Sequence, residues 1–189
     1  MIRQLKQARS QGYRIVFIDE TMFTRKTVRD EEWSLPKENF HLPTSRLDEP
    51  TLAMLPGISK ERGQEHFKVF DFSVNIDKFK EYLVELRAAN KEDKICLFMD
   101  NLSTHVSKKS QANMRAQGFK YIYNAAYMPD WNPIEFIFSK VKNKFKKYRA
   151  QKMIGLRQED HRALVAKAFM AVRKKDVVNC VKHVKKLLK

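Results

Sequence analysis

The chain has 189 residues, which suits a single domain whose core can fold without a disulfide or a structural metal. Its formal net charge is +16, and residues 140–189 carry +14 of that, with 17 Lys or Arg and three acids. Since the sequence has neither 18 consecutive apolar residues nor an apolar signal core at its N-terminus, we expect a soluble protein that is not secreted. We expect an intracellular protein, nuclear in a eukaryote and cytoplasmic otherwise.

The basic stretch at 140–189 indicates a polyanionic partner, although a solvated lysine-rich helical surface would give the same composition. Only two cysteines occur, Cys96 and Cys180, and both lie in apolar stretches, which favours buried reduced thiols. No histidine stands at zinc-ligand spacing from either cysteine, so a zinc site is not expected.

The first half of the chain predicts one helix followed by a run of strands. The short apolar run that ends at Asp19 is typical of a buried strand, and a stretch with three prolines predicts a long loop. The expected elements are a basic helix at 2–10, strands at 13–19 and 23–35, a loop at 35–50, and a hairpin of 51–58 with 66–73.

The second half alternates helices with strands and then becomes helical. Apolar residues at helical spacing begin after Asn75, Gly118 is a helix-ending residue, and Asn132 with Pro133 is a helix-starting pair. The expected helices are 76–89, 106–117, 133–149, 158–172 and 177–188, and the expected strands are 94–99 and 119–123.

This order predicts an α/β fold, in which a mixed β-sheet is flanked by helices. We divide the chain into a main unit at 1–150 and a basic helical extension of the same domain at 151–189. Ligands of such sheets gather at the carboxyl ends of the strands. If the strands at 13–19 and 94–99 are parallel neighbours, Asp19 and Asp100 reach the same edge.

Three acids are the main candidates for chemistry: Asp19, Asp100 and Glu135. The first two end apolar strands, and Glu135 opens a helix 34 residues beyond Asp100. Carboxylates are ligands for Mg²⁺, and two such ions can clamp the attacking and leaving oxygens of a phosphoryl transfer. Each acid also has a structural interpretation, as a strand-end turn residue or, for Glu135, as a partner in a capping box with Asn132.

Other polar residues near these acids are candidates for secondary roles. His105 could contact a phosphate or orient water near the metals, or could be a helix-start histidine bonded to the backbone. The lysines that follow Glu135 are the first candidates for contacts with phosphates, of which two or three can face one way: Lys140, Lys142, Lys144, Lys146 and Lys147.

Four stretches resemble the catalytic domain of mariner-like DDE transposases, a group of DDE superfamily endonucleases. They are Phe17 to Thr21, Leu97 to Asn101 with His105, Tyr127 to Glu135, and the lysine-rich helix after Glu135. The 34-residue interval is also that of one large branch of the family. The resemblance covers roughly residues 13–150.

The resemblance implies an RNase H-like fold and strand cleavage followed by strand transfer on DNA, dependent on two Mg²⁺ or Mn²⁺ ions. It implies that Asp19 bridges the ions while Asp100 and Glu135 flank them, with Asn101, His105 and Asn132 as supporting residues. It also implies a homodimer, because the segment at about 30–50 reaches a partner subunit in the family.

Two other functions stay open at this point. A transposase-derived protein without activity would bind DNA through its basic helices, although unused carboxylates at one edge would repel both DNA and one another. A different RNase H-like nuclease would act on hybrids or junctions, and the stretch from Tyr127 to Glu135 argues against it.

Overall fold

The computed structural model describes residues 1–24, 50–91, 93–126, 128–153, 155 and 159–187. A short helix, α1 (Ile2–Ser10), precedes the first strand. The strands are β1 (Arg14–Ile18), β2 (Thr21–Phe23), β3 (Leu52–Ser59), β4 (Gly63–Asp71), β5 (Ile95–Met99) and β6 (Lys120–Tyr123). The remaining helices are α2 (Ile76–Ala88), α3 (Ser103–Val106), α4 (Lys108–Ala116), the short 3-10 helix η3 (Pro129–Trp131), α5 (Ile134–Met153), α6 (His161–Met170) and α7 (Lys174–Leu187).

These six strands form one mixed sheet. β1, β5 and β6 run parallel to one another, whereas β3 pairs antiparallel with β1, β2 and β4. β1 pairs with Gly57 and Ile58 of β3, and β2 pairs with the stretch from Leu52 to Met54. Asp19 therefore lies at the break between two strands that follow the same partner.

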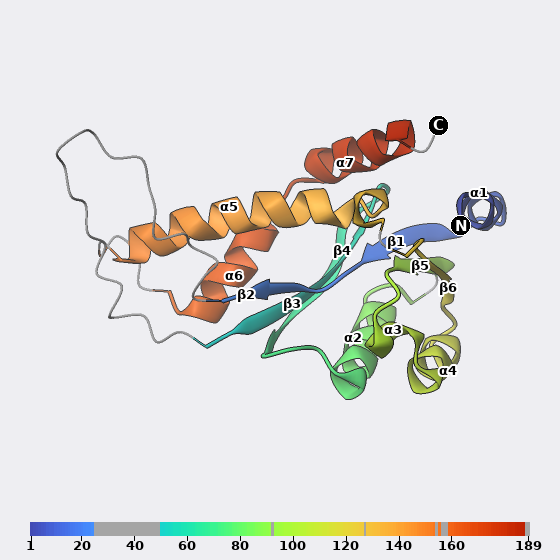
Figure 1. The fold of residues 1–189 in the computed structure, drawn as a ribbon, viewed down its shortest axis with the longest axis horizontal. Coiled ribbons are helices and arrows are strands. Elements are labelled where there is room, and N and C mark those ends of the chain that lie inside the picture. Colours follow the sequence, from blue (N-terminus) through green and yellow to red (C-terminus); the bar gives the residue numbers. More distant parts are fainter. Residues whose placement is uncertain (25–49, 92, 127, 154, 156–158, 188–189) are drawn as a thin grey trace.

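Helices cover both faces of the sheet, and alternate residues of each strand enter different cores (Figure 1). Ile15 and Phe17 of β1 belong to the core shared with α1, α5, α6 and α7, while Val16 and Ile18 belong to the core under α2 and α4. Since β1 and β5 are buried on both faces, their sequences are continuously apolar rather than alternating.

The predicted order of the elements matches the observed order, although several of their boundaries differ. Of the strand expected at 23–35, only Phe23 lies in a strand, β2 at Thr21–Phe23, and residues 25–35, like residues 35–49 of the expected loop, lie outside the described residues. The second hairpin strand begins at Gly63, three residues earlier than expected, because Gly63 adopts a φ of +86° that closes a tight turn.

Two further differences concern helices. The helix expected at 106–117 is two helices, since Ser107 leaves the helical conformation and its Oγ accepts the backbone N–H of Ser110 to start α4. The last helix starts at Lys174 rather than 177, where Asp176 in its first turn accepts the backbone N–H of Arg173. Gly118, with a φ of +69°, follows the end of α4 as predicted.

The C-terminal helices belong to the same packing as the sheet. Leu164 and Phe169 of α6 and Val177 and Val181 of α7 are buried in one cluster with β1 and α5 residues. Both cysteines are buried free thiols. Within the described ranges, no helix has the length and apolar character needed to cross a lipid bilayer.

Candidate active site

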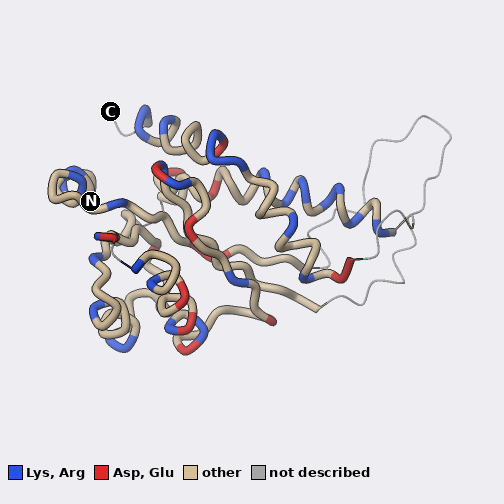
Figure 2. The backbone as a smooth tube through the Cα atoms, turned by 180° about the vertical axis from the view of Figure 1, so that it is seen from behind, with Lys and Arg blue, Asp and Glu red and all other residues tan. Residues whose placement is uncertain are grey.

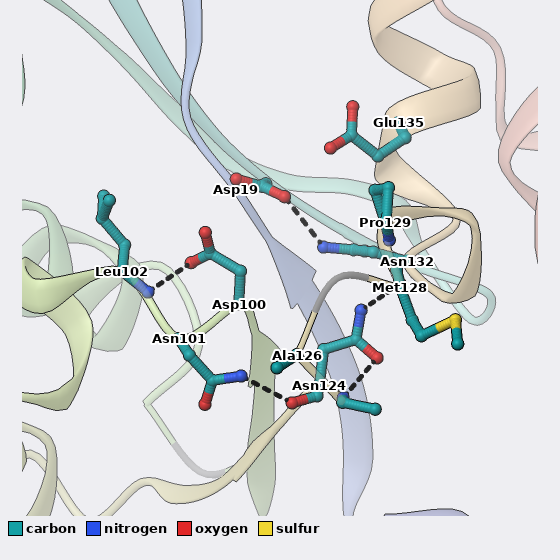
Figure 3. A pocket seen from close by; sticks show the side chains of 11 residues that line it. Asp19, Asp100, Asn101, Leu102, Asn124, Ala126, Met128, Pro129, Asn132 and Glu135 are labelled. Carbon is teal, nitrogen blue, oxygen red and sulfur yellow. Dashed lines mark hydrogen bonds between the residues drawn. The ribbon is translucent and has the colours of Figure 1, made fainter.

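Asp19, Asp100 and Glu135 line one pocket, a cavity of about 450 Å³. Asp19 follows β1 and Asp100 follows β5, and the two strands are parallel neighbours, so both carboxylates emerge at the same edge. Glu135 lies in the first turn of α5, and its carboxylate points from the helix toward Asp19, which lies between Glu135 and Asp100 (Figure 3). The edge predicted from the sequence is thus where the three side chains meet.

Asn132 joins the end of β1 to the start of α5. Its side-chain amide donates to Asp19 Oδ2 at 3.2 Å and to the Ile18 carbonyl at 3.3 Å, while its Oδ1 accepts the backbone N–H of Ile134 at 3.3 Å. The side chain is buried. Asn132 therefore binds the first backbone N–H of α5, which begins at Ile134 rather than at the predicted 133, and also fixes one oxygen of Asp19.

His105 contacts Asp100 directly. Its Nδ1 lies 2.6 Å from Asp100 Oδ1, and the ring is only 1% exposed, packed against Phe79 with ring centroids 4.9 Å apart. Tyr123 Oη donates to the His105 carbonyl at 3.0 Å. Because His105 is not among the residues that line the pocket, it orients Asp100 and has no direct access to a substrate there.

The carboxylates of the site repel one another. Burial, together with the charges of Asp100 and Glu135, raises the pKa of Asp19 to about 7. Burial also raises the pKa of Glu135, to which Asp100 and Asp130 add, while Lys142 opposes them. For Asp100 burial acts upward too, but the hydrogen bond and charge of His105 hold its pKa below the usual value.

A divalent cation would relieve this repulsion, and the donors are the hard carboxylate oxygens that Mg²⁺ and Mn²⁺ accept. Among the described residues, no group of three or more His, Cys, Asp or Glu side chains is close enough together to hold a single ion. Magnesium sites of one or two carboxylates, completed by water and phosphate oxygens, need no such group. The residues present therefore fit ions shared between protein and substrate.

Asn124, which was not predicted from the sequence, organises the pocket wall on the Asn101 side. The Asn124 backbone donates to the Met99 carbonyl at 2.7 Å, and its side chain donates to the Met128 carbonyl at 2.6 Å. Asn101 in turn donates to the Asn124 carbonyl at 2.8 Å. Asn124 directly follows β6 as Asp100 follows β5, and that position after a strand was the available signal.

The five predicted lysines lie outside the pocket lining, along α5 (Figure 2, blue). Residues seven and eleven positions after Glu135 return to its side of the helix, which puts Lys142 and Lys146 on one face with it. Lys140, Lys144 and Lys147 fall on another face, and Lys140 pairs with Asp176 at 3.1 Å. The five thus form two separate rows.

Known structures share this fold. The chain aligns over 98% of its length with the Mos1 mariner transposase in a paired-end complex with Mn, at TM-score 0.68 and 13% identity, and spans 57% of that chain. It aligns over 98% with the Mos1 catalytic domain, of which it spans 84%, at TM-score 0.64 and 13% identity. A chain of a simian T-cell lymphotropic virus intasome gives TM-score 0.58 at 13% identity, with coverage of 82% here and 46% there.

These likenesses show that the chain has the RNase H-like fold of the Mos1 catalytic domain. A sequence search against curated proteins gives no match. The profile of the DDE superfamily endonucleases, in contrast, matches residues 14–157, which is most of the chain and includes all three acids. The chain belongs to the DDE superfamily endonuclease family.

Proposed function

We propose that this chain is the catalytic domain of a metal-dependent DDE transposase that cleaves DNA strands and joins the freed 3′ ends to target DNA. The observation that carries the proposal is the meeting of Asp19, Asp100 and Glu135, from three separate elements, in one pocket. Family membership and the shared fold support it, as does a basic helix that starts at the same pocket.

Five residues in or beside the pocket have a role in this proposal. Asp19 and Asp100 hold the cations on the two strand ends, and Glu135 closes the site from α5. Asn132 and the Glu20 backbone N–H each donate to one oxygen of Asp19, and His105 contacts one oxygen of Asp100, so that both carboxylates are held in a fixed orientation at the pocket. Two bound Mg²⁺ or Mn²⁺ ions would supply charge neutralisation at the attacking and leaving oxygens of the phosphodiester.

Nicking of supercoiled plasmid DNA with Mn²⁺ tests the proposal. We expect Asp19→Asn, Asp100→Asn and Glu135→Gln each to lower the rate by at least about a thousandfold, because each removes a charge that the metal site needs. Asp77→Asn is the matched control, since Asp77 lies on α2 and pairs with Lys109 at 2.8 Å. It should retain the wild-type rate.

Two results would contradict the proposal. Nicking that persists unchanged in all three variants would assign the activity to another site. DNA binding without nicking, combined with a calorimetric titration in which Mn²⁺ binding does not depend on the acids, would favour the inactive DNA-binding protein instead.

The proposal includes a homodimer on DNA, since strand transfer has to bring two DNA ends together. Sedimentation with and without an oligonucleotide duplex measures this directly. A complex that contains two chains is the expected result. A one-to-one complex at all concentrations would contradict the homodimer and leave the proposed catalytic activity untouched.

A further inference from the structure

A second strongly basic surface lies outside the pocket, where α1, the turn between β3 and β4, and α7 meet. Arg9 lies in the last turn of α1, Lys60 in the turn, and Lys185 in the last turn of α7, and all three side chains are exposed. Helix α1 and the end of α7 lie near the N and C labels in Figure 2, whereas α5 extends toward the other end of the molecule. The surface is therefore distinct from the lysine rows of α5.

The lysines of α7 all face one side of that helix. At 3.6 residues per turn they fall within about a third of its circumference, and all of them are exposed: Lys174, Lys175, Lys182, Lys185 and Lys186. The apolar side of α7 is buried, and Asp176 lies on the side toward α5, where it pairs with Lys140 at 3.1 Å. We call these five lysines, together with Arg9 and Lys60, the α7 surface.

Packing between the three elements fixes the backbone of the α7 surface. A Cβ on Gly63, at the end of the turn, would lie 3.0 Å from Lys174 Cα, so the turn lies directly against the start of α7. Ala8 of α1 and Val181 of α7 belong to one buried cluster. The cations of the surface are thus carried by elements that share a core.

These cations repel one another and lack carboxylate partners. Burial, together with the charges of Arg9 and Lys60, lowers the pKa of Lys185, and Glu61 opposes this effect without cancelling it. Among the described residues, the ion pairs of α7 all involve Asp176, and none involves a lysine of the α7 surface. A polyanion would relieve this repulsion.

The shape and composition of the α7 surface favour a nucleic-acid duplex. Its lysines extend over about 16 Å of helix, along which a duplex presents about ten phosphate charges. A helix that lies on a membrane exposes apolar side chains beside its cations, whereas the apolar side of α7 is buried within the protein. Protein interfaces, in turn, are enriched in aromatic side chains and depleted of lysine.

We propose that the α7 surface is a second DNA-binding surface, which holds a duplex segment other than the one at the pocket. The inference rests on the proposed function, which makes DNA the polyanion. Lysines contact phosphates as point charges, and phosphates carry no sequence information, so the second segment is held whatever its sequence. One chain then keeps a second duplex beside the strand that it cleaves, as the joining of a freed end to another DNA molecule requires.

Sedimentation of the whole chain with an excess of a short fluorescent duplex, in Ca²⁺, counts the duplexes bound per chain. The wild type should bind two. The triple variant Lys182→Ala, Lys185→Ala, Lys186→Ala should bind the second duplex at least tenfold more weakly, and the log–log salt slope of that step should fall by about 0.9 for each lysine that contacted a phosphate.

A second triple variant, Lys80→Ala, Lys91→Ala, Lys108→Ala, is the matched control. It removes the same charge from exposed lysines on or near α2 and α4, which cover the other face of the sheet. It should bind two duplexes as the wild type does. An equal loss in this control would show that net charge alone holds the second duplex, which would overturn the inference.

Two further results would overturn it. One is a wild type that saturates at one duplex per chain, and the other is an α7 triple variant that takes the second duplex as tightly as the wild type. Saturation at one duplex, combined with binding to phosphatidylserine vesicles that the α7 triple variant loses, would assign the surface to a membrane instead.

Asp100→Asn separates this inference from the proposed function. It should lose nicking and keep the second duplex, because Asp100 lies in the pocket and not on the α7 surface. Acid-dependent nicking by a chain that binds one duplex overturns the inference alone. Nicking that does not depend on the acids overturns the proposed function and this inference with it.

Discussion

The two ends of strand β1 differ in their charged groups, which form ion pairs at the start of the strand and repel one another at its end. At its start, Arg14 lies 2.7 Å from Glu65 and 2.8 Å from Asp93, and Arg62 also lies 2.8 Å from Asp93. The Glu65 side chain is fully buried there and paired. At the other end, Asp19 faces two further carboxylates, and their repulsion adds to burial in raising its pKa.

This difference separates structure from function within one strand. Compensated charges at the start of β1 join the β3–β4 hairpin to the segment before β5. Uncompensated charges at its end destabilise the free protein, and residues of that kind cluster at functional sites. If this comparison holds, substitutions at the two ends must affect folding and activity in opposite ways.

The largest expected effect is on stability, at the paired end. Arg14→Met leaves the buried carboxylate of Glu65 without its partner, so we expect the free energy of unfolding to fall by about 3 kcal/mol. Urea denaturation followed by circular dichroism measures it. The double variant Arg14→Met with Glu65→Met should recover most of the loss, because apolar side chains of similar size can replace a buried ion pair.

An Arg14→Met variant as stable as the wild type would mean that Glu65 is not held by this pair. The two ends of β1 would then not differ in the way described.

The next largest effect is expected at the acidic pocket, where β1 ends. His105→Leu removes the donor to Asp100 Oδ1, so we expect the Mn²⁺ concentration for half-maximal nicking to rise about 10- to 100-fold. His105→Gln, whose amide can still donate, should recover part of the loss, which a purely structural role of the ring would not predict. His66→Gln is the control, because His66 pairs with Glu85 on the β4 side, outside the pocket. Equal metal requirements in all variants would contradict the role of His105.

The catalytic edge could be predicted from the sequence because parallel buried strands leave a simple signature. The apolar runs before Asp19 and Asp100 end at the residues that matter, and parallel pairing brings such ends together. Asn132 was predicted as a helix cap, and its bond to Asp19 followed only from the structure, because a cap signal does not say which strand lies beside it.

Contacts between distant segments account for what the sequence did not predict. Arg14 and Glu65 are 51 positions apart, and nothing in either local sequence marks them as partners. Asn124 follows the strand β6, whose four residues are too few to give an apolar run that marks the next residue as a candidate site residue. The separation of α3 from α4 at Ser107 depends on one side-chain cap that competes with a continuous helix.

A smaller effect is expected from the charge excess itself. Glu135→Gln removes one of the mutually repelling carboxylates while it keeps the shape of the side chain. We expect the free energy of unfolding in EDTA to rise by about 0.5–1 kcal/mol, even though nicking is lost. Glu65→Gln is the matched substitution at the paired end and should lower it. A lower free energy of unfolding for Glu135→Gln would show that repulsion among the pocket carboxylates does not destabilise the free protein.

The smallest effect concerns how far the lysines of α5 offset the negative charge of the pocket at which the helix begins. Lys142 lies on the Glu135 side of α5 and lowers the pKa of that glutamate, whereas Lys140 lies on another face and already pairs with Asp176. We expect Lys142→Ala to weaken duplex DNA binding about threefold and to reduce the log–log salt slope by about 0.9, the value for one neutralised phosphate. Lys140→Ala should change the slope by less than half as much. Lys140 already pairs with a carboxylate, so its exchange of that partner for a phosphate adds little to the salt dependence of binding. Filter binding across a salt series compares the two. Equal slopes for both variants would mean that DNA follows the whole surface of α5 rather than the face that leads into the pocket.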